Sequence, residues 1–189
     1  MWYVIQTLTG KEEELVSVIR KLVPRKFYTA CFFFERLLLK RLGGEWLEVT
    51  ETLFPAYVFL ETGYPQEMFF ELKRVPEFTK LLGDNRLQDY GRAMFIPLYA
   101  GEEAFLRKLC GYGAKKGADG DRFCIRLTTI RLDGAGAITG IDGPLEAFQD
   151  RIEKYNFRKR YAVVDLPGRG RKWTAVLGIR MERDEGGNT

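Results

Sequence analysis

The sequence contains no histidine in its 189 residues and only three cysteines, at positions 31, 110 and 124. Without histidine, Ser-His and Cys-His nucleophilic sites and histidine metal sites are excluded. An odd number of scattered cysteines fits neither a disulfide framework nor a paired-thiolate metal site, and it favours a reducing, cytoplasmic compartment. We therefore predict no catalytic residue, no bound metal and no cofactor.

Long apolar runs are also missing. No segment approaches the roughly 18 to 20 consecutive apolar residues that span a bilayer, and the chain begins with the strand-like residues Trp2 to Ile5. We expect a soluble, unexported monomer with no membrane partner.

Nucleotide-binding motifs are absent from the sequence. There is no P-loop, and the glycines at 134, 136 and 140 have the wrong spacing for a dinucleotide fingerprint. No acidic cluster has a recognisable metal-site pattern. A magnesium-dependent nucleic-acid-processing enzyme is therefore the least favoured of the functions considered. The prediction is a binding protein and not an enzyme.

Hydrophobic periodicity predicts the first elements. Residues 2–7 indicate a buried strand, and Thr9 with Glu12 forms a capping-box pattern before a helix. Apolar residues at i, i+3, i+4 and i+7 from Leu15 give that helix one apolar face, and Pro24 ends it.

The next segments alternate strands and helices. We expect strands at 27–34 and 47–53, joined by a turn at Gly43-Gly44, and a central strand at 56–60. The remaining predictions are a helix from Pro65 to Pro76, a strand at 78–82 and a helix at 101–110. The order βαβββαβα is typical of an α+β domain with two or three helices on a mostly antiparallel sheet.

Glycine-rich sequence separates this part from the rest. We expect an N-terminal domain over residues 1–111, a partly structured linker over 112–136, and a small all-β barrel over 137–183. The barrel prediction rests on short β-type runs separated by turns. The tail, 184–189, is predicted to be disordered.

Three segments resemble one family. Residues 2–7 (WYVIQT), 53–59 (LFPAYVF) and the pair Val75-Pro76 are similar to the N-terminal domain of the NusG family of transcription elongation factors. Residues 141–148, followed by strands and a charged hairpin, resemble the KOW module that ends such proteins. Together the matches extend over nearly the whole chain.

Some positions depart from the usual family pattern. Ala56 replaces the usual glycine, and Asp150 stands where a turn glycine is common. These departures resemble specialised paralogs of the RfaH, LoaP and UpxY types, which act as antiterminators. A helical C-terminal module, as in the RfaH type, is not expected, because the sequence there is β-rich and punctuated by glycine.

The resemblance implies two contacts for the N-terminal domain. An aromatic sheet face would bind the clamp helices of the largest RNA polymerase subunit, a role that falls on Trp2, Phe54 and Tyr57. Arg74, at the end of the second helix, would approach the non-template DNA strand. The competing interpretations are that the aromatic residues are core and that Arg74 is a solvated surface residue.

The C-terminal segment is basic. Between residues 151 and 172, eight cations stand against Glu153 and Asp165, with Phe157 and Tyr161 among them. Cations and aromatics suit nascent RNA, either single-stranded or in a hairpin; long cationic side chains on a soluble barrel are the alternative. The predicted RNA-binding residues are Lys154, Arg158, Lys159, Arg160, Arg169, Arg171 and Lys172.

Two functions remain open. The first is an elongation and antitermination factor that binds RNA polymerase through its N-terminal domain and RNA, or a recruited factor, through its basic module. The alternative is a transcription-translation coupling adaptor, whose module binds a ribosomal protein through an apolar strand edge near Leu145 and Phe148.

Overall fold

Two compact units make up the protein. The computed structural model describes residues 1–75, 96–117, 120–168 and 173–182. The first unit contains the described residues within Met1–Phe33, Phe54–Glu103 and Lys116–Arg122, and the second those within Phe34–Leu53, Ala104–Lys115 and Phe123–Thr189. Three of the described strands and one described helix therefore begin in one unit and end in the other. Over these residues no helix is long and apolar enough to cross a membrane.

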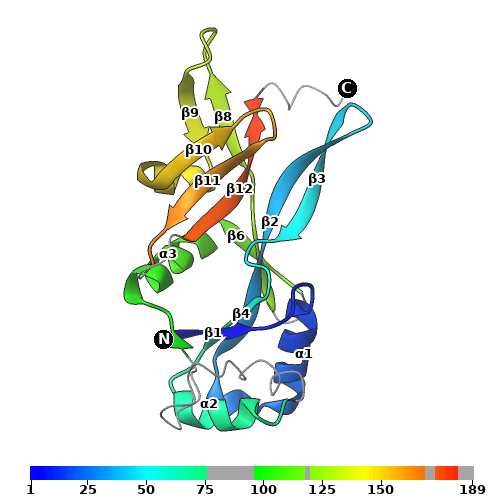
Figure 1. Ribbon diagram of the computed structural model, residues 1–189, viewed down its shortest axis with the longest axis vertical. Coiled ribbons are helices and arrows are strands. Elements are labelled where there is room, and N and C mark those ends of the chain that lie inside the picture. The colour runs from blue at the N-terminus through cyan, green and yellow to red at the C-terminus, as the bar shows by residue number, and fades with distance from the viewer. Residues whose placement is uncertain (76–95, 118–119, 169–172, 183–189) are drawn as a thin grey trace. The chain divides into compact units, whose positions relative to one another are not determined.

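The first unit is a sheet with helices on one face (Figure 1). Strand β1 lies between β4 and β5, and β4 pairs in turn with the beginning of β2, all antiparallel. The elements are β1 (Trp2–Gln6), α1 (Glu12–Leu22), the 3-10 turn η1 (Arg25–Phe27), β2 (Ala30–Leu42), β4 (Tyr57–Glu61), α2 (Pro65–Leu72) and β5 (Ile96–Pro97).

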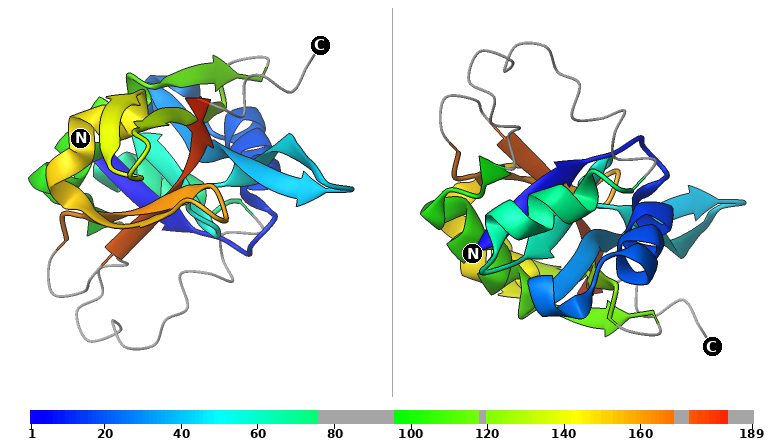
Figure 2. Two further views of the ribbon diagram at one scale, coloured as in Figure 1. Left: turned by 90° about the horizontal axis from the view of Figure 1, so that it is seen from above. Right: turned by 90° about the horizontal axis from the view of Figure 1, so that it is seen from below.

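The core of this unit lies between the sheet and its two helices. Figure 2 shows α1 and α2 side by side, and their apolar residues join every second residue of the strands in one buried cluster. The cluster comprises Ile5, Leu15, Val16, Ile19, Val23, Tyr28, Cys31, Phe33, Val58, Leu60, Met68, Leu72 and Val75. The period of two in the strands is as predicted. In α1 the buried apolar residues are Leu15, Val16 and Ile19, whereas Leu22, at i+7 from Leu15 and predicted on the apolar face, is 49% exposed.

The start of α1 differs from the prediction. No side chain caps the helix, whose N-cap residue is Lys11, so the predicted capping box is wrong. Glu12 is instead buried, and its Oε1 accepts a hydrogen bond of 2.7 Å from the backbone N–H of Ala56. Ala56 has a φ of 69°, in the left-handed region that glycine tolerates best. The carboxylate therefore serves a tight turn elsewhere in the unit, because a buried acid needs hydrogen-bond partners.

A two-residue hairpin opens the second unit. Strand β2 continues antiparallel to β3 (Glu45–Thr52), with Leu42 paired to Glu45. Gly43 and Gly44 have φ values of 59° and 95°, as a type I′ turn requires. The turn predicted from the glycine pair is confirmed.

A five-stranded C-terminal sheet completes this unit (Figure 1). Its order is β10-β11-β12-β8-β9, antiparallel except for the parallel pair of β12 and β8. The unit's elements are the later part of α3 (Ala100–Cys110), β6 (Gly113–Lys116), β7 (Arg122–Ile125), β8 (Thr128–Leu132), β9 (Ile138–Asp142), η3 (Pro144–Arg151), β10 (Ile152–Asn156), β11 (Tyr161–Leu166) and β12 (Trp173–Met181).

The predicted fold class is confirmed: helices and a mostly antiparallel sheet precede a curled, all-β sheet. Strand β8 lies within residues 112–136, the segment that we expected to be a partly structured linker. The boundary at residue 137 stays a prediction about which residues fold on their own. The strand predicted at 78–82 and the tail at 184–189 lie outside the described residues.

Strand β12 and the hairpin approach each other closely within the second unit. The Nη1 of Arg36 donates a hydrogen bond of 2.6 Å to the carbonyl of Val176. A Cβ added at Gly178 would lie 2.2 Å from the carbonyl oxygen of Leu37. Arg180 also forms an ion pair with Glu48. Glycine at 178 is thus required by the backbone that packs against it.

We predict that Gly178→Ala destabilises the protein by about 1 to 3 kcal/mol, because the added methyl group has no room beside Leu37. Urea unfolding followed by tryptophan fluorescence measures the change. Gly134→Ala is the matched control, since an added Cβ there meets nothing within 4 Å. Equal midpoints for the two variants would contradict the close approach.

Candidate nucleic-acid interface

A row of aromatic rings lines the sheet face of the first unit that points away from the helices. Trp2 meets Phe32 with ring centroids 5.0 Å apart, Phe32 meets Phe59 at 5.9 Å, and Phe59 meets Phe54 at 5.9 Å. Trp2 is 4% exposed and Phe54 8% exposed, so both are core residues in this structure. Tyr57 is half-buried. The sequence grouped Trp2, Phe54 and Tyr57 on one surface, and the structure brings the first two into one ring row.

Tyr57 begins β4 after a tight turn. Its backbone N–H donates to the carbonyl of Phe54 at 3.2 Å, and Thr7 donates to the carbonyl of Ala56 at 2.8 Å. The turn thus ties the start of β4 to the end of β1. The Tyr57 side chain that follows this turn is half-buried and so has partial access to solvent.

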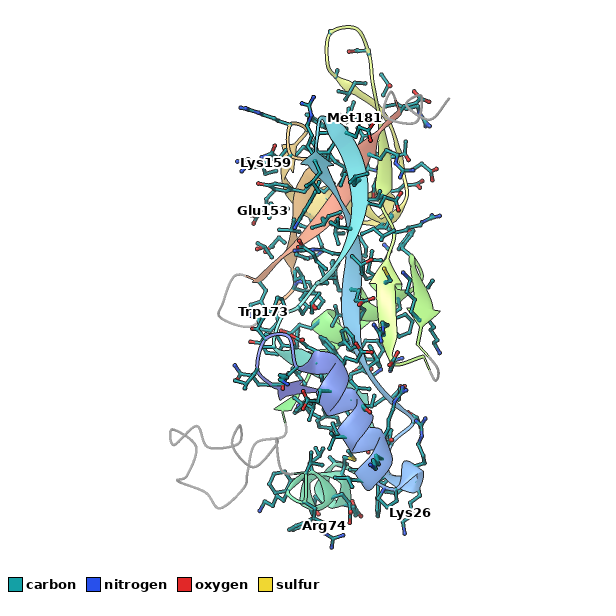
Figure 3. All side chains as sticks on the ribbon, turned by 90° about the vertical axis from the view of Figure 1, so that its right-hand side faces the viewer. Lys26, Arg74, Glu153, Lys159, Trp173 and Met181 are labelled. Atoms are coloured by element: carbon teal, nitrogen blue, oxygen red, sulfur yellow. The ribbon has the colours of Figure 1, made fainter. Side chains whose placement is uncertain are left out.

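Arg74 lies just beyond the end of α2 and is the most accessible of the predicted site residues there. Its side chain is 75% exposed, and its Nη1 lies 3.1 Å from both carboxylate oxygens of Glu71. Beside it, the Lys73 ammonium lies 4.6 Å from the ring centre of Phe69 and 5.7 Å from that of Phe70. Figure 3 shows Arg74 at the outer edge of this unit.

The cations of the C-terminal sheet gather at the β10–β11 turn. Lys154, Arg158 and Lys159 are exposed, and Figure 3 labels Lys159 and Glu153 on this part of the sheet. Asn156 shapes the turn, because its Oδ1 accepts a hydrogen bond of 2.9 Å from the backbone N–H of Lys159. Arg169, Arg171 and Lys172 lie outside the described residues.

Arg160 differs from its neighbours. It is 7% exposed, has a φ of 58°, and places its guanidinium carbon 4.7 Å from the ring centre of Trp46. The guanidinium also donates to the carbonyl of Phe157, and the Arg160 carbonyl accepts from Ile179 at 3.0 Å. These contacts give Arg160 a structural role in joining β11, β12 and the hairpin.

The two aromatics predicted among the cations are half-buried. Phe157 stacks on Tyr155 with ring centroids 5.5 Å apart, and burial raises the pKa of the Tyr155 hydroxyl. The hydroxyl of Tyr161 accepts a hydrogen bond of 3.2 Å from the side-chain amide of Asn156. Both rings are therefore partly covered rather than fully open to solvent.

The cations of the β2–β3 hairpin are engaged locally. Lys40 forms an ion pair with Glu51, and the hydrogen bond from Lys40 is the main cause that lowers the pKa of the Glu51 carboxyl. Arg41 donates from Nε to the carbonyl of Gly44 at 3.2 Å. Both cations therefore contribute to the hairpin itself.

The predicted apolar strand edge near Leu145 and Phe148 is wrong. Residues Pro144–Arg151 form a 3-10 segment, and both side chains are buried. The ring of Phe148 lies 4.4 Å from that of Phe105, and the Lys108 ammonium donates to the carbonyl of Ala147 at 2.9 Å. Proline and glycine before this segment favour a turn, and packing against α3 makes the apolar residues core.

The described residues contain no group of three acidic or cysteine side chains that could hold a metal ion. Burial raises the pKa of the thiols of Cys31 and Cys110 to about 12, so neither is a thiolate near neutral pH. The chemical character of the surface comes from its cations and aromatic rings.

Comparison with known proteins identifies the family. A family model described as "Transcription termination factor nusG" matches residues 1–97. "Transcription termination/antitermination protein NusG" from Lactococcus lactis subsp. lactis (strain IL1403) is 27% identical over 179 residues, covering 89% of this chain and 85% of the relative. A solved structure titled "Domain interaction in Thermotoga maritima NusG" is 18% identical with a TM-score of 0.47, covering 94% and 92% of the two chains.

The family model matches residues 1–97, which are more than half of the chain. The chain therefore belongs to the NusG family. NusG-family proteins are transcription elongation and termination factors. This is the class to which the sequence resemblance pointed.

The burial of Arg160 makes a testable distinction among the basic residues. Arg160→Ala should lower the free energy of unfolding by about 1 to 3 kcal/mol, because it removes the contact with Trp46 and a buried hydrogen-bond donor. Arg158→Ala should change it by less than about 0.5 kcal/mol, because Arg158 is exposed. Chemical denaturation of both variants tests this, and a stable Arg160→Ala protein would refute the structural role.

Proposed function

We propose that this transcription factor is a specialised antiterminator that binds RNA polymerase through its N-terminal aromatic face and nascent RNA through its C-terminal sheet. The exposed cations Lys154, Arg158 and Lys159 carry the proposal. From Ile152 to Arg160 their only acidic neighbour in the sequence is Glu153. A surface of this charge attracts a polyanion, and an elongating polymerase supplies one as its transcript.

Phosphate contacts account for the affinity in this proposal. Each lysine or arginine that neutralises a phosphate releases counterions, so binding weakens as salt is raised. Arg160, which packs on Trp46, acts here as a support for the turn. The contacts then come from the exposed members of the set, with Arg169, Arg171 and Lys172 as further candidates from the sequence.

The polymerase contact is assigned to Trp2, Phe54 and Tyr57. Aromatic anchors supply much of the binding energy at protein interfaces, and two of these rings belong to one continuous row. Tyr57 is accessible in part, whereas Trp2 and Phe54 are buried in this structure. Their direct contact with the clamp helices therefore requires a rearrangement that exposes the face.

Arg74 completes the proposal as a contact to non-template DNA. It is largely exposed, although the ion pair with Glu71 offsets part of its charge. The protein acts by binding alone, in the cytoplasm where its polymerase works. The ribosomal adaptor has less support, because the apolar residues assigned to it are core.

The polymerase contact is tested by single-round transcription through an intrinsic terminator with a bacterial polymerase. The wild type should increase read-through, and Tyr57→Ala should reduce that gain several-fold without unfolding, because Tyr57 is only half-buried. Phe54→Leu is a second variant that keeps a buried apolar side chain. Read-through that is the same with and without the wild-type protein, on the protein's own operon leader as well, would reject antitermination.

The RNA contact is tested by charge reversal at Arg158 and Lys159. The double variant Arg158→Glu, Lys159→Glu should bind a leader RNA at least about 10-fold more weakly, with a shallower dependence on salt, because two phosphate contacts are lost. Fluorescence anisotropy across a salt series measures both effects.

Lys21→Glu, Lys26→Glu makes the same change in net charge on exposed residues of the first unit and is the control. Equal weakening by both double variants would show that only net charge matters. Unchanged RNA affinity in the Arg158, Lys159 variant, with read-through that depends on ribosomes, would favour the adaptor.

A further inference from the structure

The end of α3 and the segments that follow it carry positive charge and no negative charge. Within the second unit, Ala104–Lys115 and Phe123–Leu132 contain no aspartate or glutamate. Their basic residues are Arg107, Lys108, Lys115, Arg126 and Arg131, and all five are exposed. Exposed cations of one sign attract polyanions. None of these residues belongs to the β10–β11 turn, so the charge is separate from the proposed RNA contact.

Contacts within the fold account for part of this charge. Arg107 and Lys108 lie in the last turn of α3, where positive charge interacts favourably with the helix dipole. The Lys108 ammonium also donates to the carbonyl of Ala147 at 2.9 Å. A Cβ added at Gly140 would lie 2.4 Å from Nη2 of Arg131, so that guanidinium lies over the neighbouring strand. Lys108 and Arg131 are therefore left out of the candidate surface.

The other three cations, Arg107, Lys115 and Arg126, come together around the turn after α3. Cys110 ends that helix. Burial raises the pKa of its thiol to about 12, and the charges of Arg107 and Lys115 both act in the opposite direction, so both cations lie near the thiol. The backbone N–H of Arg126 donates to the carbonyl of Tyr112 at 3.2 Å, beside the same turn. These three cations form the basic turn surface.

The backbone beneath the basic turn surface is held in place. The N–H groups of Gly111 and Tyr112 donate to the carbonyls of Lys108 and Leu109 at 3.1 and 3.0 Å, so the turn continues directly from the helix. Leu109 is 0% exposed and Ile125, which precedes Arg126, is 1% exposed. The cations therefore project from an anchored turn, which lowers the entropy cost of binding.

This surface offers charge without an open aromatic ring. Phe105 is buried, and Tyr112 and Phe123 are half-buried. The ring of Tyr112 lies 6.3 Å from that of Phe148, and the ring of Phe123 lies 6.0 Å from that of Phe34. Among the described residues, no exposed large hydrophobic side chain lies in these two segments. The cations can therefore contact phosphates, whereas no ring is open for a base to stack on.

We propose that Arg107, Lys115 and Arg126 form a site for the phosphate backbone of a double helix. The proposal goes beyond the proposed function, because it assigns a second nucleic-acid contact on other elements and does not require the RNA contact of the β10–β11 turn. Duplex DNA and the paired stem of a transcript share this backbone, and the test distinguishes the two.

Charge density favours the double helix over a single strand. A DNA duplex carries one negative charge per about 1.7 Å of its axis, roughly twice the density of one strand. Single strands gain much of their affinity from bases that stack on aromatic rings, which this surface does not offer. At equal length and salt, the basic turn surface should therefore bind the duplex more tightly.

The test measures fluorescence anisotropy of a labelled duplex of about 20 base pairs, of DNA or of RNA, and of the corresponding single strands, across a salt series. The full chain with Arg158→Glu, Lys159→Glu is the background, so that the β10–β11 turn does not contribute. Lys115→Gln, Arg126→Gln should weaken duplex binding about 10-fold and make the slope of log affinity against log salt shallower by about 1.8, because two phosphate contacts are lost. Lys115→Arg, Arg126→Lys should keep the affinity, because it keeps the charge.

Lys40→Gln, Arg41→Gln is the matched control. It removes the same charge from exposed residues of the second unit whose partners lie in the β2–β3 hairpin. Circular dichroism checks the fold of each variant. Arg126→Gln alone leaves the Lys115 ammonium 5.7 Å from the ring centre of Phe123, so it tests the site if the double variant does not fold, with about half of the change in slope.

The outcomes separate this site from the proposed function. Duplex affinity that is equal in Lys115→Gln, Arg126→Gln and the background protein, or an equal loss in the hairpin control, overturns the site. Tighter binding of the single strand than of the duplex overturns the assignment to a double helix. A supporting result names the source: tighter binding of duplex RNA indicates a transcript stem, and tighter binding of duplex DNA indicates the DNA.

The read-through assay makes the two failures distinguishable. If read-through persists while Lys115→Gln, Arg126→Gln leaves duplex binding unchanged, antitermination stands and the basic turn surface is rejected. If read-through is absent while the same variant weakens duplex binding, the surface stands and antitermination is rejected.

Discussion

Both faces of the first unit's sheet carry buried apolar side chains, and the candidate polymerase contact depends on this constraint. One face of β1, β2 and β4 packs on α1 and α2, and the other carries the aromatic row. Alternation along a strand assigns each side chain to one face, so a shift of one residue would exchange the two sets. The antiparallel register of Tyr3 with Leu60 and of Phe32 with Phe59 keeps them apart.

Charge is distributed by a different rule. The exposed cations proposed for nucleic acid lie at or near the ends of helices and strands: Arg74 follows α2, and Arg158 and Lys159 occupy a turn between strands. Cations within the hairpin or beside it contact local partners: Lys40 forms an ion pair with Glu51, and Arg160 packs on the ring of Trp46. A cation that already contacts a partner inside the fold would have to give up that contact to bind a phosphate. The place of a basic residue in the fold therefore matters more for nucleic-acid binding than the number of basic residues.

Local sequence rules predicted much of the fold. The helix before Pro24, the Gly43-Gly44 turn and the strands of the C-terminal sheet depend on propensity and periodicity, and the structure has them near the expected residues. The errors concern tertiary partners. Glu12 was assigned to a cap but bonds to Ala56, and Phe148 was assigned to an edge but packs on Phe105. In both cases the deciding partner lies more than forty residues away, which no local window includes.

The candidate sites likewise divide into features that the local sequence shows and features that tertiary packing decides. The family resemblance singled out Arg74, and the run of cations singled out the basic C-terminal segment, because charge is visible residue by residue. It could not show that Arg160 is buried or that Phe70 is exposed, because burial is decided by packing. Phe69 and Phe70 are adjacent and chemically identical, and the turn of the helix relative to the core determines which of them faces solvent.

The close approach of Gly178 to Leu37 links segments of the second unit that are 141 residues apart in the chain. With no side chain between them, β12 cannot loosen without releasing the backbone of the hairpin, and Arg36 and Glu48 add polar contacts to the same strand. The amide hydrogens of these two segments should therefore exchange with solvent through one shared opening. In folding, the hairpin would gain its full protection only after β12 is in place.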